Sequence, residues 1–207
     1  MKFESLTNHI ARLATLVIAF AFFSFGYSFL GFLHQQPTIH FHEYALEGII
    51  VELAGHFVFG TISVLPLLDG ESILLGGALG IFIDADHVLG ALNLNVSSRP
   101  DHSILFVLFS TLFLVLVARR TGKKKAELTR IVFVVPAAIL SHIAYDVLAS
   151  FQVSGGQGFT FPLFAPFSFE LLPLPFSAWI LLELLAFSTA ACGRVTAERR
   201  NLTPDGM

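Results

Sequence analysis

The chain has 207 residues, of which 55% are hydrophobic and only 13% are charged, and its formal net charge is −3. A soluble domain of this size needs more charged surface, so the composition predicts a protein embedded in lipid, and the small negative charge argues against a nucleic-acid partner. The single cysteine, Cys192, excludes an internal disulfide and a thiolate metal site, so any metal ion must be held by histidines and carboxylates.

Apolar segments that predict membrane spans recur along the whole chain; each crossing needs about 20 mostly apolar residues, and only the fourth segment is short for this, although it carries no charge. In chain order these segments are 13–33, 45–68, 72–92, 103–118, 131–150 and 171–192. The predicted fold class is an all-α integral membrane bundle of about six transmembrane helices. We predict a single domain over 1–207, with an N-terminal anchor helix and outer loop (1–44), a motif-bearing core (45–170), a last span (171–192) and a cytoplasmic tail (193–207).

Lysine and arginine residues predict the orientation of this bundle. They gather at both ends of the chain and in the loop 119–130, three regions that an even number of spans places on one side of the membrane. The opposite side receives only Arg99. The positive-inside rule therefore predicts a multi-pass protein of the cell (inner) membrane with cytoplasmic N- and C-termini.

Ionisable residues inside spans are costly in lipid and indicate a functional site. Under the predicted topology most of them lie toward the outer ends of neighbouring spans, and His142 and Asp146 lie on one helical face. Imidazole with carboxylate and no thiolate suits a borderline divalent cation such as Zn, Mn, Fe or Co. The predicted metal ligands are His56, Asp84, Asp86, His87, His102, His142 and Asp146. Such a cluster indicates a hydrolytic metal site near the outer face.

Several of these residues also have a simpler interpretation. His56 taken alone fits a hydrogen-bonded core histidine, and the His142–Asp146 pair fits a polar contact between helices. Asp84 and Asp86 fit the end of a helix near water. Glu52 lies one turn from His56, so it can support that histidine without binding metal itself.

Five motifs in order resemble the LexA-regulated, inner-membrane-associated metal-dependent hydrolases, or YdjM-like proteins. The motifs are His56, a glycine-rich run leading to Asp84-Ala85-Asp86-His87, the segment Arg99-Pro100-Asp101-His102-Ser103, the His142-x-x-x-Asp146 helix, and Gly155-Gly156 through Leu163-Phe164-Ala165-Pro166-Phe167. The resemblance covers residues 50–170. Ile83 stands where the family has proline and Asp101 where it has threonine, and the histidine that precedes the arginine in the family has no counterpart here.

The family in turn is similar to the zinc-dependent phospholipase C and P1 nuclease superfamily, which implies a phospholipase C/P1 nuclease-like core. The order of ligands in that superfamily falls on His56, Asp84 or Asp86, His102, His142 and Asp146. The superfamily's further ligands have no counterpart after Asp146, so the resemblance implies one or two divalent ions, with Zn favoured and Mn as the alternative. With two ions, Asp146 would be the bridging carboxylate.

The function implied is metal-dependent hydrolysis of a phosphoester in a lipid or lipid-linked substrate. The predicted catalytic residues are Asp84 and Asp86, and the predicted substrate contacts are Arg99, Asp101 and Ser103. Two other functions use the same residues. A membrane transporter or metal-ion carrier would use the cluster as a transit site, and a non-catalytic scaffold would use it only to hold helices together.

Overall fold

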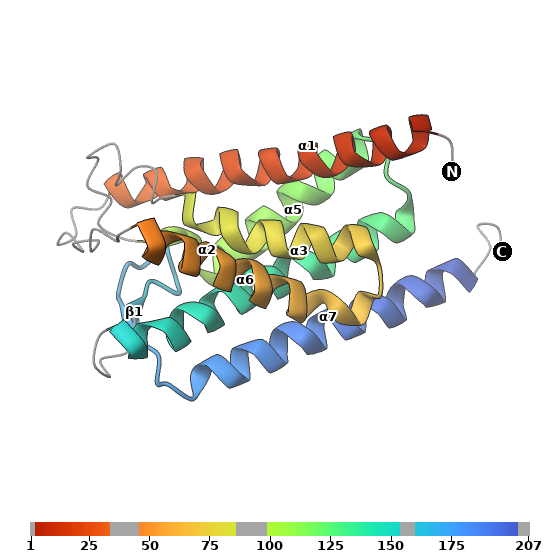
Figure 1. Cartoon of the computed structure of the whole chain (residues 1–207). Coiled ribbons are helices and arrows are strands. Elements are labelled where there is room, and N and C mark those ends of the chain that lie inside the picture. Colours follow the sequence, from red (N-terminus) through yellow and green to blue (C-terminus); the bar gives the residue numbers. More distant parts are fainter. Residues whose placement is uncertain (1–2, 34–45, 86–98, 154–159, 203–207) are drawn as a thin grey trace.

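The computed structural model describes residues 3–33, 46–85, 99–153 and 160–202. These residues form six α-helices, drawn in Figure 1: α1 (Phe3–Ser28), α2 (Leu46–Val64), α3 (Gly70–Phe82), α5 (Ile104–Arg120), α6 (Lys125–Val153) and α7 (Ala178–Leu202). The strands of the described part, β1 (Thr160–Phe161) and β2 (Leu172–Pro173), pair antiparallel as one short ribbon. The predicted all-α bundle is therefore confirmed, and no sheet core exists in the described part of the chain.

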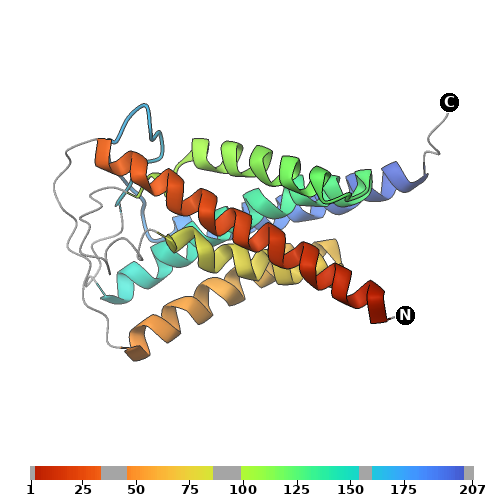
Figure 2. The same ribbon diagram turned by 90° about the horizontal axis from the view of Figure 1, so that it is seen from above.

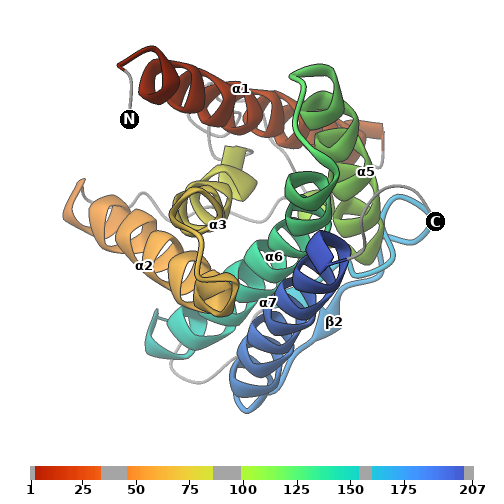
Figure 3. The ribbon, with the colours of Figure 1, turned by 90° about the vertical axis from the view of Figure 1, so that its right-hand side faces the viewer.

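Helix α6 is the central element of the bundle. Of its most apolar stretch, 67% is buried, whereas the corresponding share is 28%, 28% and 22% in α1, α2 and α7. Viewed end-on, α3 lies between α1, α2 and α6 (Figure 3), and α1 crosses obliquely over α3 (Figure 2). The outer helices expose large apolar side chains such as Phe22, Val51 and Leu181, as expected for surfaces that face lipid.

Among the described residues, four helices are long and apolar enough to span a membrane, over Thr7–Gly31, Ile50–Leu67, Lys125–Phe151 and Ala178–Arg200. Helices α3 and α5 have 13 and 17 residues. At 1.5 Å per residue they are about 20 and 26 Å long, which is shorter than the hydrocarbon core of about 30 Å. Two of the six predicted spans are therefore helices shorter than the hydrocarbon core is thick.

The third and sixth predicted spans differ from the observed helices in their boundaries. The third span was predicted over 72–92 with an interruption at Asp84, Asp86 and His87; α3 ends at Phe82, a 3₁₀ turn, Ile83–Ala85, follows with Asp84 outside helical geometry, and residues 86–92 lie outside the described residues. The sixth span was predicted to begin at 171, but α7 begins only at Ala178, because the prolines of the segment 171–177 lack the amide hydrogen that a helix interior needs. Helix α7 then continues to Leu202, through part of the predicted tail.

Glycines bring α2 and α3 into backbone contact. A Cβ atom on Gly60 would lie 2.5 Å from the carbonyl oxygen of Gly76, and one on Gly80 would lie 2.6 Å from that of His56. Small residues four apart are the usual means by which membrane helices approach this closely. The contact sets His56, in the middle of α2, beside the last turn of α3 and the turn that carries Asp84.

Ion pairs hold the opposite end of α3. Asp69 caps the helix by accepting a hydrogen bond from the Ser72 amide at 3.1 Å, and Arg130 lies 3.4 Å from the same carboxylate. Glu71 pairs with Lys123, whose ammonium is almost fully buried. Because both partners come from the α5–α6 connection and the start of α6, the short α3 is fixed relative to the central helix.

Candidate metal centre

The histidines and aspartates of the candidate site come from four different parts of the bundle. His56 lies in α2, Asp84 in the turn after α3, His102 in the 3₁₀ turn before α5, and His142 and Asp146 on α6. The three histidines have no exposed surface, and Asp84 and Asp146 are 7% and 4% exposed. Buried charges of this kind require charged or metal partners.

The histidines and aspartates of the site lie at similar depths along the long axis of the bundle. At 1.5 Å per residue, His142 and Asp146 lie about 16 and 10 Å below the end of α6 at Val153, and His56 lies about 15 Å from the start of α2 at Leu46. Helix α3 ends and α5 begins at this same depth. Non-helical backbone is tolerated inside a membrane only where protein buries it or where it lines a cavity. The turn after α3 and the turn before α5 therefore lie at the site.

Four donor atoms converge on one point between His102, His142 and the two aspartates. His102 Nε2 lies 3.0 Å from both His142 Nε2 and Asp146 Oδ2, and 3.9 Å from Asp84 Oδ1. His142 Nε2 lies 3.3 Å from Asp84 Oδ1 and 3.6 Å from Asp146 Oδ2. Four ligands placed tetrahedrally at about 2.0–2.2 Å from an ion would be roughly 3.3–3.6 Å apart. The residues therefore fit one divalent ion such as Zn.

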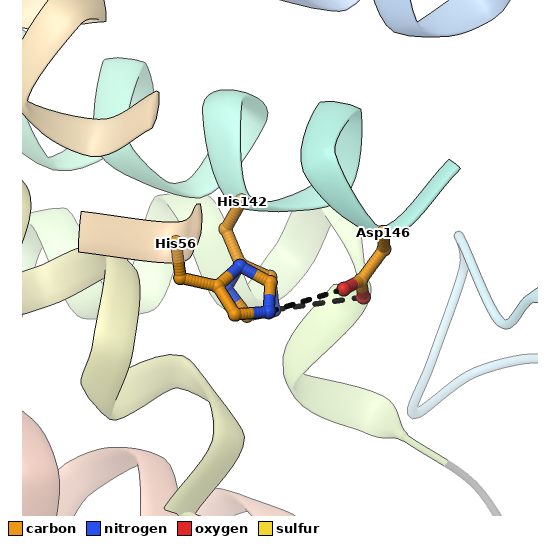
Figure 4. A group of neighbouring side chains, drawn as sticks. All are labelled: His56, His142 and Asp146. Atoms are coloured by element: carbon orange, nitrogen blue, oxygen red, sulfur yellow. Dashed lines mark ion pairs between the residues drawn. The ribbon is translucent and has the colours of Figure 1, made fainter. Parts of the chain in front are cut away.

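His56 lies beside His142 and faces the other oxygens of the same two carboxylates. Its Nε2 lies 3.2 Å from Asp84 Oδ2 and 3.3 Å from Asp146 Oδ1. Its ring stacks on that of His142 with centroids 3.9 Å apart, as Figure 4 shows. Within the described residues neither ring nitrogen of His56 makes a hydrogen bond. A fully buried imidazole without hydrogen bonds is unusual and fits a metal ligand.

Hydrogen bonds to the far nitrogens orient two of the rings. His142 Nδ1 donates to the Gly80 carbonyl oxygen at 2.7 Å, and His102 Nδ1 lies 2.8 Å from Asp101 Oδ1. Asp101 Oδ2 in turn accepts a hydrogen bond from Ser28 of α1 at 3.1 Å. A proton on Nδ1 leaves the Nε2 lone pair to face the site, as is usual for histidines that bind metals. Ser28 carries no local sequence pattern that would identify it as part of the site.

The predicted substrate contacts take different positions. Arg99 is 7% exposed, pairs with Asp84, and donates from Nη1 to Asp146 Oδ2 at 3.0 Å, so it lies within the cluster itself. Asp101 is fully buried against His102, and the Ser103 hydroxyl caps α5 by accepting from the Phe106 amide at 3.1 Å. Contact of these three residues with a substrate stays a prediction.

Three further residues with metal-binding side chains are Asp86, His87 and Glu52. Asp86 and His87 lie outside the described residues. Glu52, which sequence reasoning assigned only a supporting place, forms a three-residue donor group with His56 and Asp84, in which the donor atoms lie within 4.8 Å of one another. Its spacing of four residues from His56 is the signal that identifies it, because residues four apart share a helical face.

These features define a class: a helical membrane protein whose buried histidines and aspartates could hold a metal ion. The family model described as YdjM inner membrane protein matches residues 51–203, and the chain belongs to this family. No curated protein and no solved structure matched the chain. The further likeness to the phospholipase C and P1 nuclease superfamily finds no support in these comparisons.

Proposed function

We propose that this membrane protein is a metal-dependent hydrolase of a phosphoester in a lipid or lipid-linked substrate. The observation that carries the proposal is the convergence of His102, His142, Asp84 and Asp146, with donor atoms 3.0–3.9 Å apart, beside the buried guanidinium of Arg99. Structural contacts between helices do not require several lone-pair donors to face one point. A metal ion together with a cation for phosphate is the combination that phosphoester chemistry requires.

In this reaction the ion and the surrounding side chains would have different roles. A divalent ion in this site supplies Lewis-acid polarisation of a phosphoryl oxygen and makes water a stronger acid. Arg99 provides fixed donors beside the ion, where its guanidinium can orient the oxygens of a phosphoryl group. Asp84 and Asp146 would hold the ion together with His102 and His142, and their contacts with Arg99 would fix the guanidinium beside it. Gly80 and Asp101 hold the rings of His142 and His102 in position.

The depth of the cluster supports a lipid substrate. The site lies about 10–16 Å below one end of the long helices, on the side opposite the basic loop 119–130. A lipid phosphate sits at the edge of the hydrocarbon core, so a modest displacement of the headgroup reaches this depth. The predicted orientation places that end toward the outer face.

Elemental analysis of the detergent-purified protein tests the proposal. We expect at least one equivalent of a divalent transition metal in the wild type and in His9→Ala, whose exposed histidine lies outside the cluster. A His142→Ala/Asp146→Ala variant should lose the metal while remaining inserted. The loaded wild type, and not this variant, should release product from a phospholipid or lipid-phosphate in mixed micelles. Protein without metal after reconstitution with Zn or Mn would indicate the scaffold function, and metal with transport but no hydrolysis would indicate a carrier.

A further inference from the structure

The two buried aspartates each present their oxygens in two directions. Asp84 Oδ1 and Asp146 Oδ2 face the Nε2 atoms of His102 and His142, at 3.0–3.9 Å. The other oxygens, Asp84 Oδ2 and Asp146 Oδ1, face His56 Nε2 at 3.2 and 3.3 Å. One carboxylate pair thus separates two sets of donors, which we call the His102/His142 side and the His56 side.

Glu52 belongs to the His56 side. It precedes His56 by one turn of α2, and its carboxylate oxygen lies within 4.8 Å of the donor atoms of His56 and Asp84. The His56 side thus comprises one imidazole, one glutamate and two aspartate oxygens. His56 is fully buried, and within the described residues its ring nitrogens make no hydrogen bond; the groups that its Nε2 faces are the Asp84 and Asp146 carboxylates, so imidazole and carboxylate donors lie together on this side.

We propose that the centre binds two divalent ions, one on each side of a bridge formed by Asp84 and Asp146, and that Glu52 is a ligand of the ion on the His56 side. Ions in two-metal sites lie about 3.5–4 Å apart, a separation that a carboxylate with one oxygen on each ion can span. Arg99 contacts the oxygens that face His102 and His142. Each carboxylate oxygen has two lone pairs, so Arg99 and an ion can share one oxygen.

The net charge of the centre favours two bound ions over one if the substrate is anionic. The described residues of the centre contribute four carboxylates, Glu52, Asp84, Asp101 and Asp146, and one guanidinium, Arg99. With neutral histidines and one divalent ion, these groups leave a net charge of about −1, which repels a phosphoester. A second ion changes the net charge to about +1, which attracts it.

This inference rests on the proposed metal centre. It is tested by counting the bound ions, without any measurement of hydrolysis. The protein is saturated with Zn, passed into metal-free buffer and assayed by elemental analysis. We expect two equivalents in the wild type and one in Glu52→Gln. Glu183→Gln is the matched control, because it neutralises a carboxylate inside an apolar helix outside the cluster, and it should keep two. Glu52→Asp retains the charge, so it should keep two ions with weaker binding of one.

Spectroscopy distinguishes loss of one ion from misfolding. Mn-loaded wild type should show the spin-coupled electron paramagnetic resonance of an ion pair, and Glu52→Gln the uncoupled six-line signal of one ion. One equivalent in the wild type, or two in Glu52→Gln, would overturn the inference. Two bound ions with no hydrolysis of any phosphoester would leave it standing and would reject only the proposed hydrolase activity.

Discussion

Gly80 is the position at which the packing of α2 on α3 and the geometry of the candidate metal centre depend on the same backbone atoms. A Cβ atom there would lie 2.6 Å from the His56 carbonyl oxygen, and the Gly80 carbonyl holds His142 Nδ1 at 2.7 Å. An ordinary carbon–oxygen contact is about 3.3 Å or longer. Gly80→Ala must therefore move α2 and α3 apart by roughly 0.7 Å, and the side chains of His56 and His142 move with them.

The size of the effect follows from that displacement. Overpacking a tight contact costs about 1–3 kcal/mol, partly offset by the higher helix propensity of alanine, so we expect a net loss of stability of about 1–2 kcal/mol. Ligand positions in a metal site tolerate about 0.5 Å, and disturbing a group that orients a ligand typically lowers metal affinity by about 10–100-fold. Both losses should appear together in this single variant.

Two assays on the detergent-solubilised protein measure these effects: reversible unfolding in mixed micelles, and competition of Zn with a fluorescent chelator. Gly26→Ala is the control, because Gly26 lies in α1 with no atom within 4 Å of an added Cβ. It should leave metal affinity unchanged and stability equal or slightly increased. If Gly80→Ala matched Gly26→Ala in both assays, α2 and α3 would not be in backbone contact and the proposed placement of His56 would be wrong.

Three further predictions concern other parts of the molecule. Asp101→Asn removes the charged partner of His102 Nδ1 and should weaken Zn binding by about 10–100-fold in the chelator assay; unchanged Zn affinity with loss of hydrolysis alone would instead place Asp101 on the substrate. Lys123→Met leaves Glu71 without its partner and should cost about 2 kcal/mol in micelle unfolding, since Glu71 is partly exposed, and adding Glu71→Gln should restore much of it. Green fluorescent protein fused to the C-terminus should fluoresce and alkaline phosphatase fused there should be inactive, because the basic residues predict a cytoplasmic end; the reverse pattern would invert the orientation.

Residue types and spacing along the chain were enough to predict the membrane bundle and most of the candidate cluster. Long apolar runs have a large transfer free energy that does not depend on neighbours, so the spans at 13–33 and 131–150 were predictable, and α1 and α6 cover most of the first and all of the second. His142 and Asp146 were expected on one face because four residues make about one helical turn, and both do face the centre. Their assignment as ligands stays a prediction.

Which donors meet, and how, was decided by packing. The contact of Gly80 with the backbone of His56, the split of Asp84 and Asp146 between two sets of donors, and the place of Glu52 all depend on how closely α2, α3 and α6 approach. The end of α3 before Asp84 was one of two interpretations left open, because hydropathy does not distinguish a helix that crosses the bilayer from one that stops inside the bundle. Hydrophobicity and helical period are local properties of the sequence, whereas the direction of a carboxylate oxygen is set by contacts between segments far apart in the chain.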